Sequence, residues 1–201
     1  VAAPWSIFND QQDSFSQRDT GWIQLYCRDN QEIVDTIIQA YRISERVLAP
    51  VMVCYDGFIL SHTMMPVEIP GIEDVHSFLP PYRPVRPLSP DDPFTINPVF
   101  FPWQRENDKG VLCDGYMEMR HKLFRALEDS RAVIDETARE FAVRFGRDHG
   151  GLIWDYRAGD ADVIIVGMGS LATEATVAVD ILRERGIAAG VVAIRAFRPF
   201  P

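Results

Sequence analysis

The feature that most constrains the fold of this chain is a run of eight prolines between Pro80 and Pro102, in LPPYRPVRPLSPDDPFTINPVFFP. Proline lacks the amide donor that a central strand needs, and it disfavours helix at the residue before it. We therefore predict an extended connector rather than a helix or a strand. Its aromatic residues favour packing along a surface, with ligand contact as the alternative.

The residues before the connector have the pattern of a strand–helix–strand unit. VAAPWSIF and WIQLYC indicate two buried strands, and VMVCY indicates a parallel strand covered on both faces. Asp29 followed by Glu32 predicts a capping box at the start of a helix that ends before Pro50, with a right-handed crossover. We expect the apolar stripe of this helix to face the core: Ile33, Val34, Ile37, Ile38, Tyr41, Ser44 and Val47.

Two further elements are predicted after the connector. Residues Val111 to Phe145 indicate one long helix, or two helices broken near Ser130, with Gly146 after the last turn. The run ADVIIVGMGSLATEATVAVDILRERGIAAGVVAIRAF indicates a second strand–helix–strand unit, whose helix is capped by Ser170 and stopped by a glycine. The fold class is therefore α/β. The predicted core face of the long helix consists of Met119, Leu123, Leu127, Ile134, Ala138, Phe141 and Phe145.

Bulk composition excludes several classes of function. A formal charge of −9 argues against nucleic acid as a partner, because phosphate binding requires a basic surface. No apolar run reaches the roughly 18 residues of a membrane span, so we expect no membrane partner. Cys27, Cys54 and Cys113 are isolated, which predicts neither disulfides nor a metal or iron–sulfur site and fits a reducing cytoplasm. The chain begins at Val1 inside an apolar run, so we expect a piece of a longer protein.

Polar residues gather in two loops that follow predicted strands. NDQQDSFSQRDT follows the first strand and DGFILSH follows the third, so both should lie at the carboxyl edge of one sheet, where open α/β sheets place ligand sites. Asp56 and His62 could transfer a proton there, or the loop could anchor the connector. Arg18 offers a rigid fork for a carboxylate or phosphate ligand, or for an aspartate of its own segment: Asp10, Asp13 or Asp19.

The turn GMGS, from Gly167 to Ser170, lies between a strand and a helix N-terminus, where backbone N–H groups favour an anion. The third glycine of the dinucleotide fingerprint is replaced by Ala172, and no P-loop lysine follows. The alternative is that these glycines only allow a tight turn. The remaining histidines lack metal-ligand spacing and are expected at the surface or in caps: His76, His121 and His149.

Several segments resemble, in the same order, the α chain of the pyruvate-type 2-oxoacid:ferredoxin (flavodoxin) oxidoreductases. They are PWSIFNDQQDSFSQRDTGWIQLYC, NQEIVDTIIQAYRISE, PVMVCYDGFILSHTMMPVEIP, FLPPY, FGRDHGGLIWDYRAGDADVIIVGMGS and RAFRPFP. The resemblance covers essentially all 201 residues. Its motifs QRDTGW, DGF with SH, MGS and RPFP are specific in combination.

The resemblance implies an internal part of that α chain. Residues 1–70 would be the C-terminal part of a thiamine pyrimidine-binding domain, 71–110 the connector and 111–150 a linking helix. Residues 151–201, from about Asp160, would begin a transketolase-C-terminal-like α/β domain. We expect the strands of 1–70 and of 160–201 to form two separate parallel sheets, with the connector outside both.

The family decarboxylates a 2-oxoacid oxidatively on thiamine diphosphate, reduces ferredoxin through iron–sulfur clusters and forms an acyl-CoA. The resemblance implies that Mg²⁺ is held with the cofactor by a partner chain, and that clusters and CoA belong to a complex with β, γ and δ type subunits or equivalent fused domains. The glutamate that activates the cofactor and the arginine that holds the substrate should precede Val1, so no catalytic residue is assigned here. The expected pocket-lining or supporting residues are Asn9, Asp10, Gln12, Asp13 and Arg18. Support is favoured over ligand contact for Arg18 and Asp19, and a supporting Arg18 would pair with a nearby carboxylate beneath the pocket.

Two alternatives remain open. One is a transketolase-like thiamine enzyme without electron transfer, which would need no cluster-ligating cysteines on a partner. The other is a non-catalytic scaffold subunit, which thiamine diphosphate binding would exclude. The residues do not choose among pyruvate, 2-oxoisovalerate, 2-oxoglutarate and oxalate, and the 201-residue chain alone is expected to be inactive.

Overall fold

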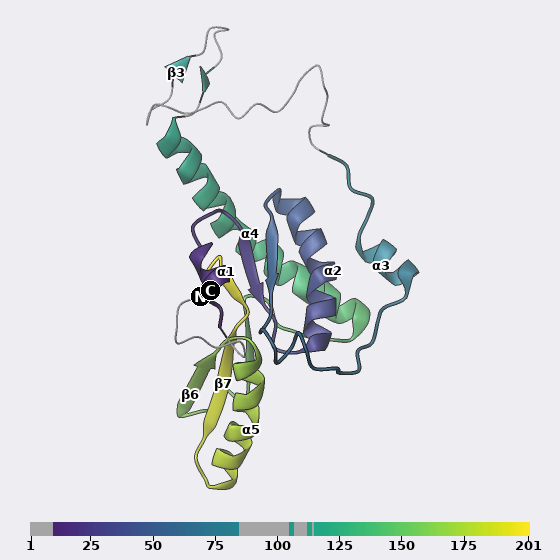
Figure 1. Ribbon diagram of the computed structural model, residues 1–201, viewed down its shortest axis with the longest axis vertical. Coiled ribbons are helices and arrows are strands. Elements are labelled where there is room, and N and C mark those ends of the chain that lie inside the picture. The colour runs from purple at the N-terminus through teal and green to yellow at the C-terminus, as the bar shows by residue number, and fades with distance from the viewer. Residues whose placement is uncertain (1–9, 85–104, 107–111, 114) are drawn as a thin grey trace.

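The computed structural model describes residues 10–84, 105–106, 112–113 and 115–201 (Figure 1). Asn9, the predicted strand VAAPWSIF and most of the proline-rich connector lie outside these residues. The helices are α1 Gln12–Ser16, α2 Asn30–Val47, α3 Ile72–Phe78, α4 Tyr116–Phe145 and α5 Ser170–Glu184. The strands are β1 Ile23–Tyr26, β2 Val51–Cys54, β3 Arg105–Glu106, β4 Leu112–Cys113, β5 Ile153–Tyr156, β6 Val163–Gly167, β7 Ala189–Ile194 and β8 Ala196–Arg198. The predicted α/β class is confirmed.

The first sheet has the order β2-β1-β8. β1 and β2 are parallel, with Ile23 opposite Val51, and α2 connects them, which confirms the first strand–helix–strand unit. β8 adds to the other side of β1 in the antiparallel direction, so the prediction of a wholly parallel first sheet is wrong. Because β8 comes from residues 160–201, the prediction that the strands of that region form only a separate sheet is also wrong. Among the described residues, β2 lies at the edge of this sheet and its first three residues are half-buried. Its coverage on both faces stays a prediction.

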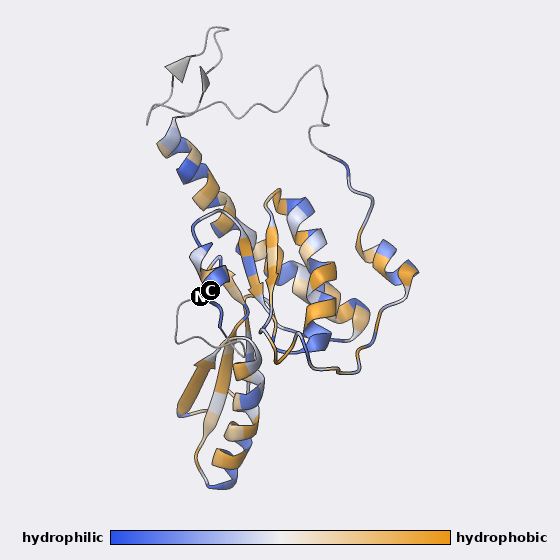
Figure 2. Ribbon diagram, in the orientation of Figure 1, coloured by the Kyte–Doolittle hydropathy of each residue, from blue (hydrophilic) through white to orange (hydrophobic). Residues whose placement is uncertain are grey.

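The second sheet has the order β5-β7-β6, with β6 parallel to β7 and β5 antiparallel to it. The β6–α5–β7 unit predicted from the sequence is therefore confirmed, and it lies in a sheet separate from that of β1 and β2 (Figure 1). Figure 2 shows β6 and β7 as hydrophobic strands beside α5. Their core combines small residues of α5 with alternate residues of β7: Ala172, Ala175, Val179, Ala189, Val191 and Ala193.

Gly190 lets the chain before β6 approach the central strand β7. A Cβ atom there would lie 2.6 Å from the carbonyl oxygen of Arg157 and 2.7 Å from the Cα of Ala158. These are backbone atoms, so relief requires the strand or its neighbour to shift. We expect Gly190→Ala to lower the free energy of unfolding of the full-length protein by about 1–3 kcal/mol, measured by chemical denaturation.

Gly159→Ala is the matched control, because a Cβ atom at Gly159 would meet nothing within 4 Å. This change is expected to alter the free energy of unfolding by less than about 0.5 kcal/mol. Equal denaturation midpoints for the two variants would show that the backbone at Gly190 moves aside freely, contrary to the expectation.

The long helix α4 is continuous through Ser130, so the alternative of two broken helices is wrong. It begins at Tyr116 rather than Val111, because Leu112–Cys113 forms strand β4, and it ends as predicted at Gly146, whose φ is +70°. Ile134 packs in a core with Ile23, Leu25, Ile43 and Ala196 of α2 and the first sheet. In the N-terminal half of α4, the predicted core residue Met119 is exposed. No helix in the described part of the chain is long and apolar enough to cross a membrane.

The buried side of α2 is polar, which contradicts the predicted orientation of this helix. Ile37 and Tyr41 of the apolar stripe are 45% and 62% exposed. The residues that α2 buries are Glu32, Asp35, Thr36, Gln39, Ala40 and Ile43. Four of these six carry polar groups that need partners in the interior. Arg28 and Gln31 supply local partners, and the other partners come from the second half of the chain.

Candidate functional site

The two polar loops meet at the carboxyl edge of β1 and β2, as the sequence predicted. Gln11 donates a hydrogen bond from Nε2 to Oδ1 of Asp56 over 2.5 Å. Asp56 is only 1% exposed, and its other oxygen accepts from the backbone N–H of Ser170 over 2.6 Å. One buried carboxylate therefore joins the first polar loop, the loop after β2 and the start of α5.

The GMGS turn brings an anion to a helix N-terminus, but that anion is part of the protein. Gly169 has a φ of +64°, and a Cβ atom there would lie 2.6 Å from Oδ1 of Asp56. Gly169 is the N-cap of α5 and makes no side-chain cap, so the prediction that Ser170 caps the helix is wrong. The cap is supplied instead by the Asp56 carboxylate, which the N-terminal partial positive charge of a helix favours.

Of the residues predicted to line the pocket, Asp10, Gln12 and Asp13 lie before or in the short helix α1, and Arg18 follows it. Asp10 accepts a hydrogen bond from the backbone N–H of Gln12 over 3.0 Å, and Asp13 accepts from that of Ser14 over 2.6 Å. The side chains of Gln12 and Asp13 are exposed. These contacts are local, so they shape the turn and leave exposed polar groups. Asn9 lies outside the described residues.

A buried layer of polar and aromatic groups anchors α1 to the first sheet. Ser14 Oγ shares a hydrogen bond of 2.7 Å with the hydroxyl of Tyr26, and Gln24 Nε2 donates to the carbonyl of Ser14 over 2.6 Å. Phe15 packs against Tyr26 with ring centroids 5.8 Å apart. Burial raises the pKa of the neighbouring Cys54 thiol to about 11, so this thiol is protonated at neutral pH. The layer fixes α1 on the sheet.

Arg18 does not sit on a buried carboxylate. Its side chain is 55% exposed, and its Nε lies 3.6 Å from Oδ2 of Asp19, which is itself exposed. Its guanidinium also donates to the carbonyl of Phe15 over 3.3 Å. Arg18 thus has an aspartate partner, as expected, but the pair is exposed and not buried. Because exposed ion pairs contribute at most about 1 kcal/mol, the expectation that Arg18 supports a pocket from beneath through a buried pair is wrong.

His62 and Asp56 do not form a proton-transfer pair. His62 is exposed, shares a hydrogen bond of 2.7 Å with Ser61 through Nδ1, and stacks on Phe58 at a ring-centroid distance of 5.2 Å. Both oxygens of Asp56 are already bound to protein donors. The loop after β2 therefore contributes a buried structural carboxylate and a histidine with separate contacts.

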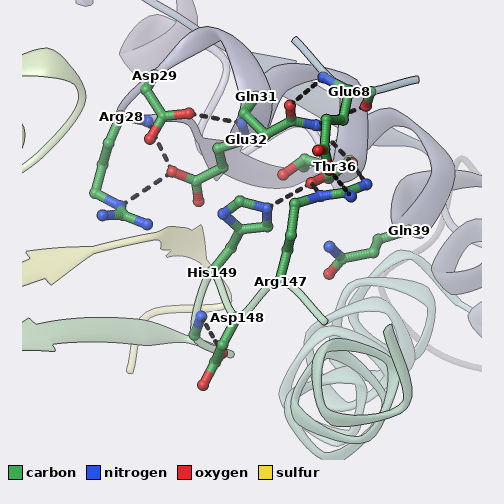
Figure 3. A network of polar contacts seen from close by, with 12 residues as sticks. Arg28, Asp29, Gln31, Glu32, Thr36, Gln39, Glu68, Arg147, Asp148 and His149 are labelled. Atoms are coloured by element: carbon green, nitrogen blue, oxygen red, sulfur yellow. Dashed lines mark hydrogen bonds and ion pairs between the residues drawn. The ribbon is translucent and has the colours of Figure 1, made fainter. Parts of the chain in front are cut away.

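A second polar cluster, absent from the sequence interpretation, centres on the buried face of α2 (Figure 3). Asp35 receives two hydrogen bonds from Arg147, of 2.7 and 2.8 Å, and one of 2.7 Å from His149 Nε2. Burial raises the pKa of Asp35, but hydrogen bonds from Arg147 and His149 outweigh it and hold the pKa below its usual value of 3.8. His149 is buried, so its predicted surface or capping role is wrong.

Glu32 extends this cluster to two more arginines. Its carboxylate lies 3.0 Å from Nε of Arg28 and 3.0 Å from Nε of Arg195. Arg195 is 1% exposed and also donates to Thr36 Oγ1 and Gln39 Oε1, each over 3.1 Å. Arg195 lies between β7 and β8, so the network ties α2 to the point where the chain passes from one sheet to the other.

The described residues do not by themselves make a complete thiamine diphosphate site. The buried carboxylate at the sheet edge, Asp56, has both oxygens engaged and is not free to activate a cofactor ring. No group of three His, Cys, Asp or Glu residues in the described ranges could hold a metal ion. What this edge does provide is the exposed amide of Gln12 and the exposed carboxylate of Asp13 on a short helix anchored to the sheet.

Comparison with protein families identifies the class. A model described as pyruvate flavodoxin/ferredoxin oxidoreductase, thiamine diphosphate-binding, matches residues 1–138. A second model, pyruvate:ferredoxin oxidoreductase core domain II, matches residues 161–201. The chain therefore belongs to the pyruvate flavodoxin/ferredoxin oxidoreductase family, which confirms the resemblance noted in the sequence.

Curated relatives match along the whole chain. Pyruvate synthase subunit PorA of Methanocaldococcus jannaschii is 46% identical over 205 residues, and that of Methanothermobacter thermautotrophicus is 45% identical over 203 residues; each match covers 100% of this chain and 50% of the relative. Ketoisovalerate oxidoreductase subunit VorA of Pyrococcus abyssi is 41% identical over 202 residues, covering 48% of that protein. The chain spans about half the length of the curated relatives it matches.

Proposed function

We propose that this chain is part of a thiamine-diphosphate-dependent 2-oxoacid:ferredoxin oxidoreductase. The reaction would be the oxidative decarboxylation of a 2-oxoacid such as pyruvate to an acyl-CoA and CO₂, with reduction of ferredoxin. The observation that carries the proposal is similarity along the entire chain to pyruvate synthase and ketoisovalerate oxidoreductase subunits. The thiamine-binding description of the family model that matches residues 1–138 supports the cofactor.

Within this function, the polar segment before and in α1 would form one lip of the cofactor site. When bound, thiamine diphosphate supplies a nucleophilic carbon for the 2-oxo group and accepts the electron pair released with CO₂. The protein's part is to bind and orient. Exposed polar groups on an anchored helix suit that task, because the buried layer beneath α1 limits its movement. The proposed lining or supporting residues in this segment remain Asn9, Asp10, Gln12 and Asp13. Arg18, which follows α1 and is exposed, is proposed as a lining residue.

We propose that the remaining parts of the reaction centre come from outside the described residues. The carboxylate that activates the cofactor and the Mg²⁺ that binds its pyrophosphate would be supplied by other residues or by a partner chain. Iron–sulfur clusters, the CoA site and the ferredoxin docking site would belong to β, γ and δ type subunits or fused domains. We also propose that the protein is cytoplasmic, which its three isolated cysteines suit.

The test is assay of the full-length protein with its partner subunits. We expect 2-oxoacid-dependent reduction of ferredoxin that requires both thiamine diphosphate and CoA, with a panel of 2-oxoacids identifying the substrate. Thiamine-dependent transfer of carbon units without ferredoxin reduction would instead support the transketolase-like alternative. Failure of the complex to bind thiamine diphosphate would support the scaffold alternative.

A further inference from the structure

The first turn of α5 lies on the loops that end the two parallel strands of the other sheet. The backbone N–H of Ser170 donates to Asp56, which follows β2. Thr173 donates from Oγ1 to the carbonyl of Arg28, which follows β1, over 3.1 Å. The second strand–helix–strand unit therefore contacts the first at its carboxyl edge, next to the polar segment that begins α1.

In these contacts, the Asp56 side chain binds both the segment that begins α1 and the first turn of α5. Each of its oxygens has its own donor, the amide of Gln11 on one side and the backbone of Ser170 on the other. Burying a carboxylate is unfavourable unless its charge and lone pairs are compensated. Within the described part of the chain no arginine, lysine or histidine forms a salt bridge with Asp56, so the compensation comes from a helix N-terminus and an amide. Its position therefore depends on both partners.

The turn before α5 approaches the Asp56 carboxylate closely at Gly169. A Cβ atom at this position would lie 2.6 Å from Oδ1 and 3.1 Å from Oδ2 of Asp56. The carboxylate is thus enclosed by the turn before α5, and it holds the residue that immediately precedes α1. Gln12 and Asp13 follow within the next two positions, so a shift of Gln11 displaces the exposed polar groups beside it.

We propose that Asp56 is a positioning residue. It binds the first turn of α5 and, through Gln11, fixes the position of the polar segment that would form one lip of the cofactor site. The inference rests on the proposed function, because it assigns the lip to thiamine diphosphate binding. We call Gln11, Asp56, Gly169 and Ser170 the Asp56 clamp. The clamp makes cofactor affinity depend on the docking of α5, although α5 belongs to the other sheet.

The decisive variant is Gln11→Ala in the full-length protein assembled with its partner subunits. It removes only the link between Asp56 and the lip and leaves the contact of Asp56 with α5 in place. We expect a thiamine diphosphate Kd at least about tenfold higher and a kcat within about twofold of wild type at saturating cofactor. The melting temperature should fall only slightly, and less than in Asp56→Ala, because the buried carboxylate loses one of its two donors. The matched control is Gln17→Ala. Gln17 is an exposed glutamine of the same segment whose side chain donates to Ser16, so its removal should not change the Kd.

Two variants of the carboxylate complete the test. Asp56→Ala removes both links and is expected to raise the Kd at least as much as Gln11→Ala and to lower the melting temperature. Asp56→Asn keeps an oxygen for the Ser170 N–H and an amide that can donate to the side-chain oxygen of Gln11. It should therefore restore the Kd to within about threefold of wild type, which corresponds to less than 1 kcal/mol.

Wild-type thiamine diphosphate affinity in Gln11→Ala would overturn the inference and leave the proposed function intact, because Asp56 would then only cap α5. The Kd of Gln11→Ala can be interpreted even if Asp56→Ala fails to fold. Absence of thiamine diphosphate binding by the wild-type complex would overturn the proposed function, and the inference with it.

Discussion

Glu32→Ala is expected to lower the free energy of unfolding by about 3–5 kcal/mol, because it leaves the buried guanidinium groups of Arg28 and Arg195 without their carboxylate. Arg195 is nearly inaccessible to water and cannot turn outward to recover solvation. The variant should also loosen the link between β7 and β8, where Arg195 lies. Chemical denaturation of the full-length protein measures the change.

The control for Glu32 is Glu136→Ala, which removes a glutamate that pairs with Arg46 on the exposed surface of α4. The same loss of a carboxylate there should leave the denaturation midpoint unchanged within error, because water replaces the lost partner. If Glu32→Ala has the same midpoint as this control, the buried network contributes no net stability and the expectation is wrong.

Asp35→Asn is expected to lower the free energy of unfolding by about 3–5 kcal/mol at neutral pH. It should also make the free energy of unfolding depend less on pH in the acid range. Hydrogen bonds from Arg147 and His149 hold the folded-state pKa of Asp35 below 3.8 despite its burial. A carboxyl group with a depressed pKa stabilises the folded state fully above its unfolded-state pKa, and this contribution is lost as the pH falls through the folded-state value. Wild type should therefore lose more stability than Asp35→Asn between about pH 5 and pH 2.

The measurement is the free energy of unfolding from urea titrations at a series of pH values. Asp148→Asn is the matched control, because Asp148 is exposed and its acceptor role toward the backbone N–H of Gly150 can be kept by the asparagine oxygen. Its acid dependence should follow wild type. Parallel curves for Asp35→Asn and wild type would show that Asp35 does not carry the expected linkage.

The sequence predicted the elements that local signals specify. The N-cap half of the predicted capping box of α2 is found, with Asp29 accepting from the backbone N–H of Glu32 over 2.8 Å. The other half differs, because the Glu32 carboxylate accepts from the N–H of Arg28 over 2.9 Å and not from that of Asp29. The rule that parallel strands end at one edge of a sheet also predicted that the two polar loops would be neighbours, and Gln11 does contact Asp56. It did not single out Gln11, because adjacent residues of NDQQD are chemically alike and only the backbone at the start of α1 decides which amide points at Asp56.

The orientation of α2 could not be predicted, because its buried carboxylates find their partners far along the chain. Arg147 and His149 are 112 and 114 residues from Asp35, and Arg195 is 163 residues from Glu32. Without these partners, hydrophobic periodicity assigns the polar side to water. The antiparallel strand β8 was missed for a related reason, since three residues, Ala196–Arg198, carry no signal that they leave the sheet of β7.

The return of β8 to the first sheet sets an order on folding. β1 gains its second neighbour only when Gln24 and Leu25 meet Arg198 and Ala196, across nearly the whole chain. Closing so distant a contact is slow, because the entropy of the intervening chain must be lost first. The N–H of Tyr26 bonds to the carbonyl of Arg195 over 2.7 Å, immediately after β7. Amide exchange at Tyr26 should therefore slow only once β7 is in place, so this one proton in the first sheet reports the maturation of the second.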